Sequence, residues 1–229
     1  MATFKKSTAR EYFESIVIAV ILALFIRTFV VQAFKIPTGS MENNLLVGDH
    51  LLVNKLVYAP TVSRFERTVL PITEIERGDV VVFKYPEEPE RDFIKRVIGL
   101  PGETLEIRNK QVYIDGMPID EPYVQFLQAP SPDGSTSYDV RERYGPVTIP
   151  ADQYFVMGDN RDNSQDSRYW GYLPRAYVKG RALMVYWSYE SDPHAYREPG
   201  LAGTVRAVGE AVPQFFSRTR WGRLFHIIR

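Results

Sequence analysis

The feature that most constrains this chain is an apolar stretch near its start. Residues Ile16–Ile26 carry only apolar side chains, and after Arg27-Thr28 the apolar character resumes and continues to Phe34. Counted from Ser15, the stretch holds roughly the 20 residues that a helix needs to cross a bilayer. It predicts a transmembrane anchor over residues 12–34.

Basic residues before this stretch set its expected orientation. Lys5, Lys6 and Arg10 precede it, and basic residues favour the cytoplasmic side of a membrane. We therefore expect residues 1–11 to be cytoplasmic and everything after Phe34 to lie on the far side.

Two alternatives compete with an anchor. The stretch could be a cleaved secretory signal, because Val31-Gln32-Ala33 has the small-x-small pattern of a cleavage site. Against this, its apolar region exceeds the roughly 7–15 residues of a signal core. It could also be a buried core helix, because its strictly uninterrupted part is short.

Composition argues against several functional classes. Basic and acidic residues balance at 28 each, which gives no electrostatic basis for a nucleic-acid partner. The chain has no cysteine, which removes thiol catalysis, disulfides and thiolate metal sites. His50, His194 and His226 lie far apart and lack the spacing of metal ligands. We expect neither a metal nor a cofactor.

Beyond Pro37 the sequence is typical of a mainly β protein with antiparallel sheets. Short β-branched and aromatic runs alternate with Gly, Pro, Asn and Asp. Asn109-Lys110 and Asp115-Gly116 have the composition of hairpin turns. Seven runs predict strands: Leu51–Tyr58, Asp79–Tyr85, Asp92–Gly99, Thr104–Ile107, Gln111–Ile114, Tyr154–Met157 and Arg181–Trp187.

The C-terminal tail, residues 200–229, combines apolar and basic residues. Trp221, Leu224, Phe225 and Ile228 are interspersed with arginines. This pattern favours a short amphipathic helix on the membrane surface. A helix that closes the core, or a frayed end, remains an open alternative.

Ser40 and Lys95 are the first two residues with candidate chemistry. Gly39 allows a sharp turn that leaves Ser40 uncrowded, as a nucleophile requires, although a serine after glycine is more often a turn residue. In a strand over Asp92–Gly99, Lys95 shares a face with Phe93 and Val97. Apolar surroundings lower the pKa of a lysine and let its amine accept a hydroxyl proton. The alternative is an edge-strand lysine with its amine in water.

A polar segment, residues 158–171, follows the strand predicted at Tyr154–Met157. Its density of small polar and ionic side chains predicts a hydrogen-bonded loop that positions other groups. Asp159, Asp162 and Asp166 also suggest a calcium loop. The segment lacks the full Asp-x-Asp-x-Asp-Gly pattern and the distant Glu of such loops.

In their order and spacing, these segments resemble the conserved boxes of bacterial type I signal peptidases, which cut signal peptides from exported proteins. About half of the chain takes part in this resemblance. It comprises the apolar stretch and residues 36–58, 77–83, 92–103, 154–174 and 180–188.

The resemblance implies a role for individual residues. Ser40 would attack the scissile carbonyl, and Lys95 would act as general base. The backbone N–H of Ser40 and the hydroxyl of Thr38 would hold the oxyanion, and Ser164 would orient the lysine amine. Structural ion pairs would form from Arg96, Asp159, Asp166 and Arg168. Shallow pockets for Ala-x-Ala would be lined by Ile36, Met41, Leu45, Phe93 and Ile94.

The resemblance also implies an architecture and a location. A catalytic β domain would comprise residues 35–101 and 151–199, with a smaller β lobe, residues 102–150, inserted between its halves. The enzyme would span the bacterial inner membrane once, with signal-peptide-bearing preproteins and the lipid bilayer as partners, and would bind no nucleic acid or metal. One departure is Asn43-Asn44-Leu45, where the family usually has Pro-Thr-Leu, and we expect the missing proline to loosen that turn.

Three other functions remain open at this point. The chain could be a non-catalytic, membrane-tethered β domain for assembly or binding. A self-cleaving SOS repressor shares serine–lysine chemistry, but it would carry a DNA-binding helical domain where this chain has its apolar stretch. A processing peptidase for a dedicated substrate, such as a pilin, is the third.

Overall fold

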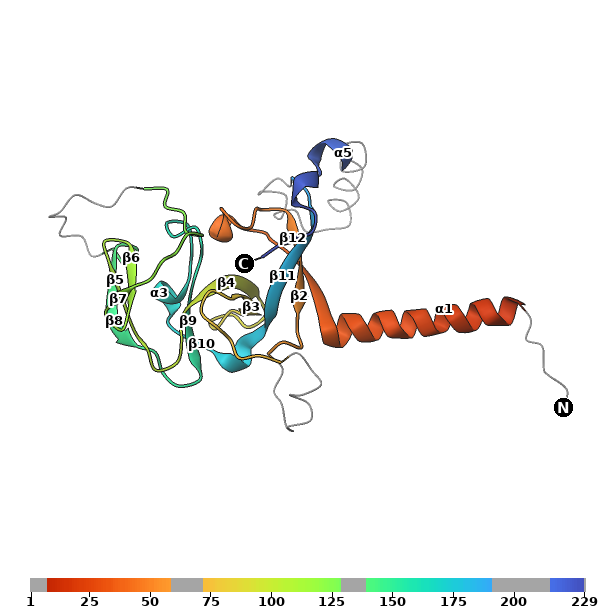
Figure 1. Cartoon of the computed structure of the whole chain (residues 1–229), viewed down its shortest axis with the longest axis horizontal. Helices are drawn as coiled ribbons and strands as arrows, with labels where there is room; N and C mark the ends of the chain where they lie inside the picture. Colours follow the sequence, from red (N-terminus) through yellow and green to blue (C-terminus); the bar gives the residue numbers. More distant parts are fainter. Residues whose placement is uncertain (1–7, 59–71, 129–138, 191–214, 229) are drawn as a thin grey trace.

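The protein combines one projecting helix with a β body (Figure 1). The computed structural model describes residues 8–58, 72–128, 139–190 and 215–228. Within these ranges the strands form one eight-stranded and one four-stranded sheet, and every paired strand in them is antiparallel. The predicted mainly β class with antiparallel sheets is confirmed.

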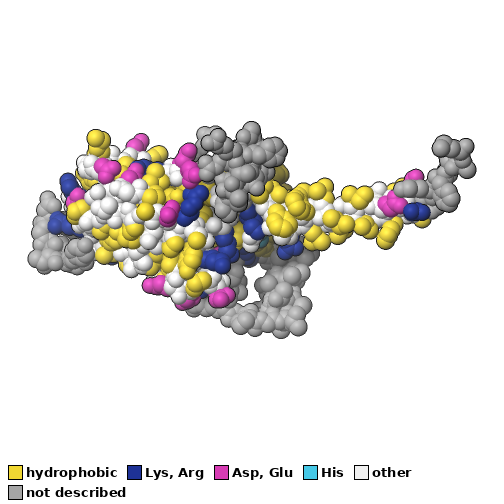
Figure 2. Space-filling view, turned by 90° about the horizontal axis from the view of Figure 1, so that it is seen from below, with side chains coloured by type: hydrophobic (Ala, Val, Ile, Leu, Met, Phe, Trp, Pro, Cys, Tyr) yellow, Lys and Arg dark blue, Asp and Glu magenta, His cyan; other side chains and the backbone are white. Residues whose placement is uncertain are grey.

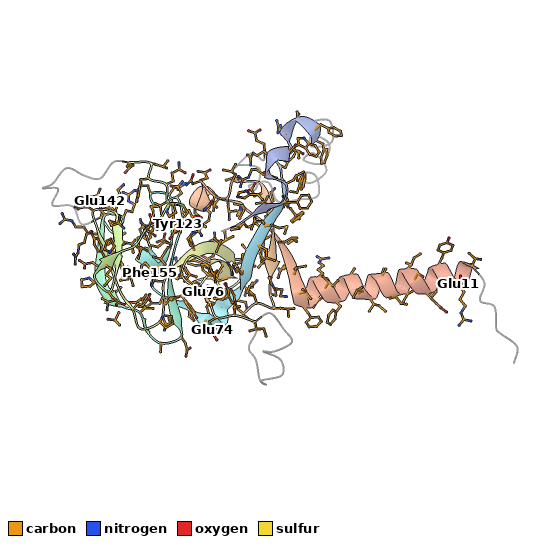
Figure 3. All side chains as sticks on the ribbon, viewed as in Figure 1. Glu11, Glu74, Glu76, Tyr123, Glu142 and Phe155 are labelled. Carbon is orange, nitrogen blue, oxygen red and sulfur yellow. The ribbon has the colours of Figure 1, made fainter. Side chains whose placement is uncertain are left out.

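The apolar stretch forms α1 (Thr8–Phe25), which continues through a π-helical turn, η1 (Ile26–Val30). Neither segment contains a buried residue, and apolar side chains cover the projecting rod in Figure 2. Figure 3 places Glu11 at the end of the helix farthest from the β body. Residues Thr8–Val30 are together long and apolar enough to cross a membrane. The alternative of a buried core helix is wrong.

The helical segment ends earlier than the anchor predicted over residues 12–34. Val31–Lys35 form strand β1, which pairs along its whole length with β2 (Asp49–Asn54). The apolar residues from Val31 on therefore belong to a sheet edge, because β2 offers their backbone a row of hydrogen-bond partners. The possible cleavage site Val31-Gln32-Ala33 lies inside this paired strand, which argues against a cleaved signal.

The large sheet has the order β1-β2-β11-β3-β4-β9-β10, with β12 also paired to β11. Burial alternates strictly along β2, whereas the first four residues of β3 are all buried. This difference identifies β3 as a central strand covered on both faces. The remaining strands of the path are β3 (Val80–Lys84), β4 (Asp92–Gly99), β9 (Gln153–Met157), β10 (Leu173–Pro174) and β11 (Val178–Ser188).

The four-stranded sheet lies within residues 102–150, the range predicted for an inserted lobe. Its order is β7-β6-β5-β8. Asn109-Lys110 and Asp115-Gly116 connect its hairpins, and all four residues have positive φ angles, as two-residue hairpin turns require. Its strands are β5 (Thr104–Arg108), β6 (Gln111–Ile114), β7 (Met117–Pro118) and β8 (Arg143–Thr148). The division into domains stays a prediction.

An apolar cluster joins the two sheets. Leu105 and Val112 of the smaller sheet belong to the same buried cluster as Ile98, Phe155 and Met157 of the larger one. Because these apolar side chains of the two sheets are buried against one another, the smaller sheet is held against β4 and β9.

The C-terminal tail is not the single helix predicted from its pattern. It contains a short helix, α5 (Phe215–Arg218), a 3-10 turn, η5 (Trp221–Arg223), and strand β12 (His226–Ile227). β12 pairs with Met184 and Val185 of β11, beyond the residues of β11 that pair with β3. Along this part of β11, one edge is not paired with β3, so its backbone N–H and C=O groups can hydrogen-bond with the tail. The tail therefore forms a strand at this point and not a surface helix. Residues 200–214 of the predicted tail lie outside the described residues.

Candidate active site

Ser40 lies on a closed loop between β1 and β2, which we call the nucleophile loop (residues 36–49) after the role predicted for Ser40. The loop closes where the Ile36 N–H donates to Asp49 O at 2.8 Å and the Gly48 N–H donates to Ile36 O at 3.0 Å. Within it, Gly39–Met41 form a 3-10 turn, η2. Ile36, Met41 and Leu45 pack in a buried apolar cluster, which fixes the loop against the sheet and leaves Ser40 8% exposed.

Lys95 reaches Ser40 from the middle of β4. Its Nζ lies 2.6 Å from Ser40 Oγ and donates to Ile94 O at 3.0 Å. Only 4% of Lys95 is exposed, and its Nζ lies 5.5 Å from the centre of the Phe93 ring. The structure therefore joins the serine and the lysine that the sequence analysis singled out separately.

Burial controls the charge of Lys95. Removal from water lowers the pKa of its amine to about 8, although the negative charges of Asp166 and Asp159 act in the opposite direction. The positive charge of Arg168 adds to the lowering. A lysine in water has a pKa near 10.4, so this amine is neutral in a useful fraction of molecules near neutral pH.

A cavity of about 670 Å³ opens onto the two side chains. Thr38 and Ser164 line it, as do Phe93 and Ile94. Ile36, Met41 and Leu45 were also predicted to line substrate pockets, but they are not among the residues at this cavity. They pack in the core cluster that supports the nucleophile loop, and Ile94 contacts that cluster from the cavity side. The other lining residues are Pro37, Ser40, Arg91, Asp92, Lys95, Asp162, Asn163, Gln165 and Tyr169.

Two buried ion pairs hold residues 158–166, which we call the polar loop. Arg96 donates to both carboxylate oxygens of Asp159, at 2.8 and 2.7 Å, and both side chains are 1% exposed. Arg168 donates to both oxygens of Asp166 at 2.8 Å. Burial alone would raise the pKa of Asp166, but the charge and hydrogen bonds of Arg168 lower it. Asp166 therefore stays charged beside Arg168, and Asp159 is paired with Arg96.

Asn160 is a site residue that the sequence analysis missed. Its backbone N–H donates to Ser40 O at 3.2 Å, and its side-chain amide donates to Gly39 O at 3.2 Å. The polar loop thus holds the backbone of the nucleophile turn directly. The density of polar residues indicated a positioning loop, but which residue touches Ser40 depends on contacts 120 positions apart in sequence.

The turn after Ser40 is held by its asparagines and is not loosened as expected. Asn43 has a φ angle of 95°, a conformation that proline cannot adopt and that asparagine tolerates better than most residues. Its side chain donates to Tyr123 O at 3.0 Å, and that of Asn44 donates to Asp159 at 2.9 Å. Hydrogen bonds thus replace the rigidity that a proline would supply.

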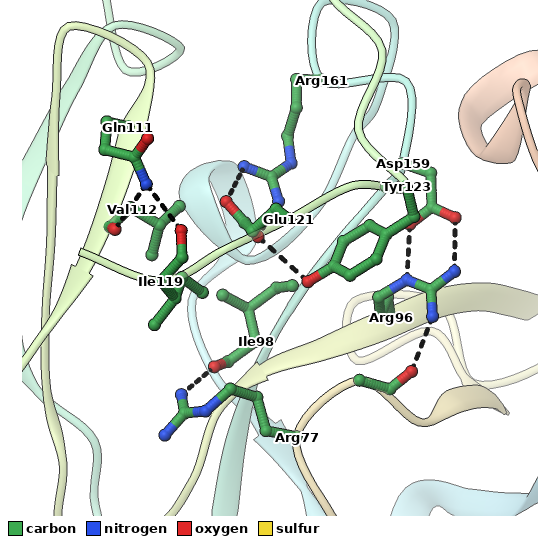
Figure 4. A network of polar contacts seen from close by, with 12 residues as sticks. Arg77, Arg96, Ile98, Gln111, Val112, Ile119, Glu121, Tyr123, Asp159 and Arg161 are labelled. Carbon is green, nitrogen blue, oxygen red and sulfur yellow. Dashed lines mark hydrogen bonds and ion pairs between the residues drawn. The ribbon is translucent and has the colours of Figure 1, made fainter. Parts of the chain in front are cut away.

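The segment of residues 121–125, between β7 and β8 of the smaller sheet, contacts the polar loop from outside. The Gln125 N–H donates to Asp159 O at 2.8 Å, and the Arg161 N–H donates to Gln125 O at 3.0 Å. Figure 4 shows Glu121 paired with Arg161 and the Tyr123 ring lying against Arg96, with 4.0 Å between the ring centre and the guanidinium carbon. These contacts attach residues 121–125 to the polar loop, which in turn hydrogen-bonds the backbone of Ser40.

Ser164 lies at the cavity without the expected bond to Lys95. Its hydroxyl is buried and lies near the Asp166 carboxylate, whose pKa it helps to lower, but it makes no hydrogen bond of good geometry to the described residues. A Cβ at Gly158 would lie 2.3 Å from Ser164 Oγ and 2.4 Å from Ser40 O. Glycine is therefore required where the polar loop approaches the nucleophile.

The histidines and the loop aspartates make contacts that differ from those of a catalytic base or a calcium site. The ring of His50 packs against Trp187 at 4.8 Å, and neither His50 nor His226 lines the cavity; His194 lies outside the described residues. The third loop aspartate, Asp162, pairs with Lys110 at 2.9 Å. The three aspartates that suggested a calcium loop are thus each paired with a basic side chain.

Comparisons with known proteins place the chain among the peptidases. The profile of the family "Signal peptidase, peptidase S26" matches residues 9–187. Signal peptidase I of Pseudomonas aeruginosa is 37% identical over 222 residues, covering 84% of this chain and 77% of that protein. The probable signal peptidase I-2 of Synechocystis is 40% identical over 217 residues, covering 86% and 88%. A crystal structure of a signal peptidase I from Enterococcus faecalis matches 48% of this chain and 97% of that chain, with 34% identity and a TM-score of 0.39.

The chain therefore belongs to the signal peptidase family, peptidase S26. Members of this family are serine peptidases, so the resemblance seen in the sequence is confirmed at the level of family and enzyme class.

Breaking the Arg96–Asp159 pair tests how much the polar loop depends on it. We expect Arg96→Met to lower the free energy of unfolding by about 3–5 kcal/mol, because Asp159 keeps a buried charge without its cation. Urea unfolding in detergent, followed by circular dichroism, measures this change. Arg108→Met is the matched control, since Arg108 also pairs with a carboxylate, that of Glu106, but is itself 58% exposed, and we expect no change in the midpoint. Equal midpoints for both variants would contradict the assignment.

Proposed function

We propose that this protein is a membrane-bound signal peptidase that cleaves signal peptides from exported preproteins with Ser40 as nucleophile and Lys95 as general base. The observation that carries the proposal is the 2.6 Å contact between Lys95 Nζ and Ser40 Oγ, buried at the edge of a cavity. Family membership supports the reaction type. A non-catalytic tethered domain would have no need for a lysine kept from water beside a serine.

The chemistry follows from the charge of the lysine. The neutral Lys95 amine takes the proton of Ser40 as its oxygen attacks the scissile carbonyl. The resulting ammonium then gives that proton to the leaving amine, and the C–N bond breaks, leaving an acyl group on Ser40. The leaving amine is the N-terminus of the shortened chain, so the acyl group on Ser40 is the signal peptide. A water molecule, deprotonated by Lys95, attacks the acyl carbon and releases the signal peptide as a free acid. Ser40 Oγ recovers the proton and the cycle closes.

The oxyanion would be held by two donors of the nucleophile loop. Ser40 lies in the first turn of η2, where backbone N–H groups have no acceptor within the helix. Thr38 lines the cavity beside it and has an extended backbone with no side-chain cap bond to the turn. Its hydroxyl is therefore available to donate to the developing negative charge.

Ser164 would orient the Lys95 amine during the reaction. Its hydroxyl lines the same cavity and is buried. Asn160 and Gly158 bring the polar loop against the backbone of Ser40. In the reacting complex the Ser164 oxygen would accept a hydrogen bond from the amine, a bond that the present geometry lacks.

Phe93 and Ile94 would select small residues ahead of the cut. Both line the cavity beside Lys95. Met41 and Leu45 lie in the core cluster that Ile94 contacts, so the cavity wall at Ile94 has packed side chains behind it. A wall that cannot yield excludes larger side chains, which is the selectivity that Ala-x-Ala sites require.

The helix would place this site at the membrane boundary. Thr8–Val30 would span the bilayer with its N-terminus in the cytoplasm, as Lys5, Lys6 and Arg10 indicate. Only β1 and residues 36–39 separate the end of the helix from Ser40. A signal peptide held in the same bilayer then meets Ser40 at a raised effective concentration.

Ser40→Ala and Lys95→Met test the catalytic pair. We expect Ser40→Ala to abolish cleavage of a signal-bearing precursor and Lys95→Met to slow it by about 10²–10⁴-fold. In the wild type, kcat/KM should rise with pH and level off above about pH 8, because only the unprotonated amine of Lys95 is active. Lys84→Met, an exposed lysine on the neighbouring strand, should cleave normally. A rise in rate centred near pH 10.4, the value for free lysine, would contradict a buried base.

Ile94→Ala tests the pocket. Widening the wall should raise the relative kcat/KM for precursors with valine or leucine in place of alanine before the cut by about 10-fold, since a methylene in an apolar pocket changes discrimination by that order. Met117→Ala, at an exposed position on β7, is the control. An unchanged ratio in Ile94→Ala would place the selectivity elsewhere.

Charges in the helix test the anchor. We expect the wild type to remain with the membrane after an alkaline wash and Val20→Asp/Leu24→Asp to be released, because each aspartate costs about 3 kcal/mol at the helix centre. The control Val20→Leu/Leu24→Val should stay in the membrane. Release of the wild type itself would rule out a spanning helix.

A further inference from the structure

The part of the tail that follows α5 packs against the nucleophile loop, although it lies outside the family match. The family profile ends at residue 187, whereas η5 and β12 lie beyond it. Figure 1 shows this C-terminal segment beside β11 and β2. Ile228 is buried in the same apolar cluster as Ile36, Met41 and Leu45. These three residues of the nucleophile loop pack the loop against the sheet.

Arg223 links the tail to the base of this loop. Its Nε and Nη2 donate to the two carboxylate oxygens of Asp49, at 3.1 and 2.6 Å, and Nη2 also donates to Asn44 O at 2.7 Å. Arg220 adds a bond from Nη1 to Val47 O at 2.9 Å. Three positions of the nucleophile loop are thus hydrogen-bonded by two arginines of the tail.

Asp49 is the point where this contact can affect Ser40. Its carboxylate is fully buried and accepts from the Leu46 N–H at 2.9 Å and the Ser188 hydroxyl at 2.6 Å, besides Arg223. Its backbone oxygen accepts the Ile36 N–H that closes the loop. A buried carboxylate that loses its cation is strongly destabilised and moves toward water, and such a movement would open the loop at its closure.

We propose that residues 220–228 are a positioning element of the active site, in which Arg223 and Ile228 hold the nucleophile loop so that Ser40 stays against Lys95. This inference rests on the proposed function, since it concerns the same pair. The polar loop holds Gly39, Ser40 and Asn44 from one side. The tail holds Asn44, Val47 and Asp49 through its arginines. The nucleophile is therefore fixed by contacts at both ends of its loop.

Arg223→Ala is the direct test, with Arg218→Ala as matched control because Arg218 is an exposed arginine of the same segment. We expect Arg223→Ala to lower kcat by on the order of 10- to 100-fold, as small displacements of reacting groups do. KM should change by less than about two-fold, since no residue of the cavity wall is altered. The rise of kcat/KM with pH should also move above pH 8, because water would reach Lys95 once Ser40 shifts. Arg218→Ala should match the wild type.

Two further variants separate positioning from stability. Arg223→Lys keeps the charge but not the paired donors, so its kcat should lie between those of the wild type and Arg223→Ala. In an Asp49→Asn background, Arg223→Ala should lower kcat by a smaller factor, because no buried charge is left unpaired. All rates are measured below each variant's unfolding midpoint, determined by circular dichroism in the same detergent.

The outcomes that overturn the proposal are specific. If Arg223→Ala loses activity only in proportion to its unfolded fraction, with wild-type kcat per folded molecule and an unshifted pH profile, the tail is merely structural. If Arg223→Ala does not fold, wild-type kcat and pH profile in Arg223→Lys overturn the proposal. Wild type and Ser40→Ala are assayed alongside, and equal cleavage by these two would reject the proposed function itself, whatever Arg223→Ala shows.

Discussion

The burial of one amine is the constraint on which the rest of the site depends. In the proposed mechanism Lys95 acts as a base only while water is kept from it, yet the charges of Asp166 and Asp159 favour its protonated form. Arg96 and Arg168 occupy both oxygens of those carboxylates. The buried ion pairs therefore do more than brace a loop. Each guanidinium lies against a carboxylate and partly cancels its negative charge. The ion pairs therefore limit how far the two carboxylates raise the pKa of Lys95.

Ser40, the proposed nucleophile, is held by elements that are far apart in the described part of the chain. β1 and β2 supply the two ends of its loop, the polar loop after β9 supplies Asn160, and the tail supplies Arg223. The smaller sheet contributes through the segment around Gln125, which hydrogen-bonds the polar loop. Each contact is between residues distant in sequence, so the geometry of Ser40 and Lys95 is a property of the complete fold.

Much of this could be predicted from the sequence, and the failures have physical causes. Each of the seven predicted strands overlaps an observed strand, and both hairpin turns are where turn residues indicated, because these signals are local. The first predicted strand was too long at its end, since β2 stops at Asn54 and not at Tyr58. Lys95 could be placed beside Phe93 from the two-residue period of a strand. β1 was missed since its apolar residues read as a continuation of the helix, and β12 because two paired residues carry no pattern. The family resemblance supplied the roles of Ser40 and Lys95, whereas Asn160 and Arg223 gain theirs from contacts that only tertiary structure defines.

The junction between helix and sheet has a consequence for the setting in which the enzyme works. The π-helical turn leads into β1 without a linker. Lys55, the residue after β2, ties this turn to the sheet: its backbone N–H donates to Val30 O and its amine donates to Thr28 O. A spanning helix adapts to thinner or thicker bilayers by tilting. Because no flexible linker separates the helix from β1, a change in tilt would rotate the β body by the same angle. Lipid composition would then set the angle and depth at which Ser40 meets its substrate.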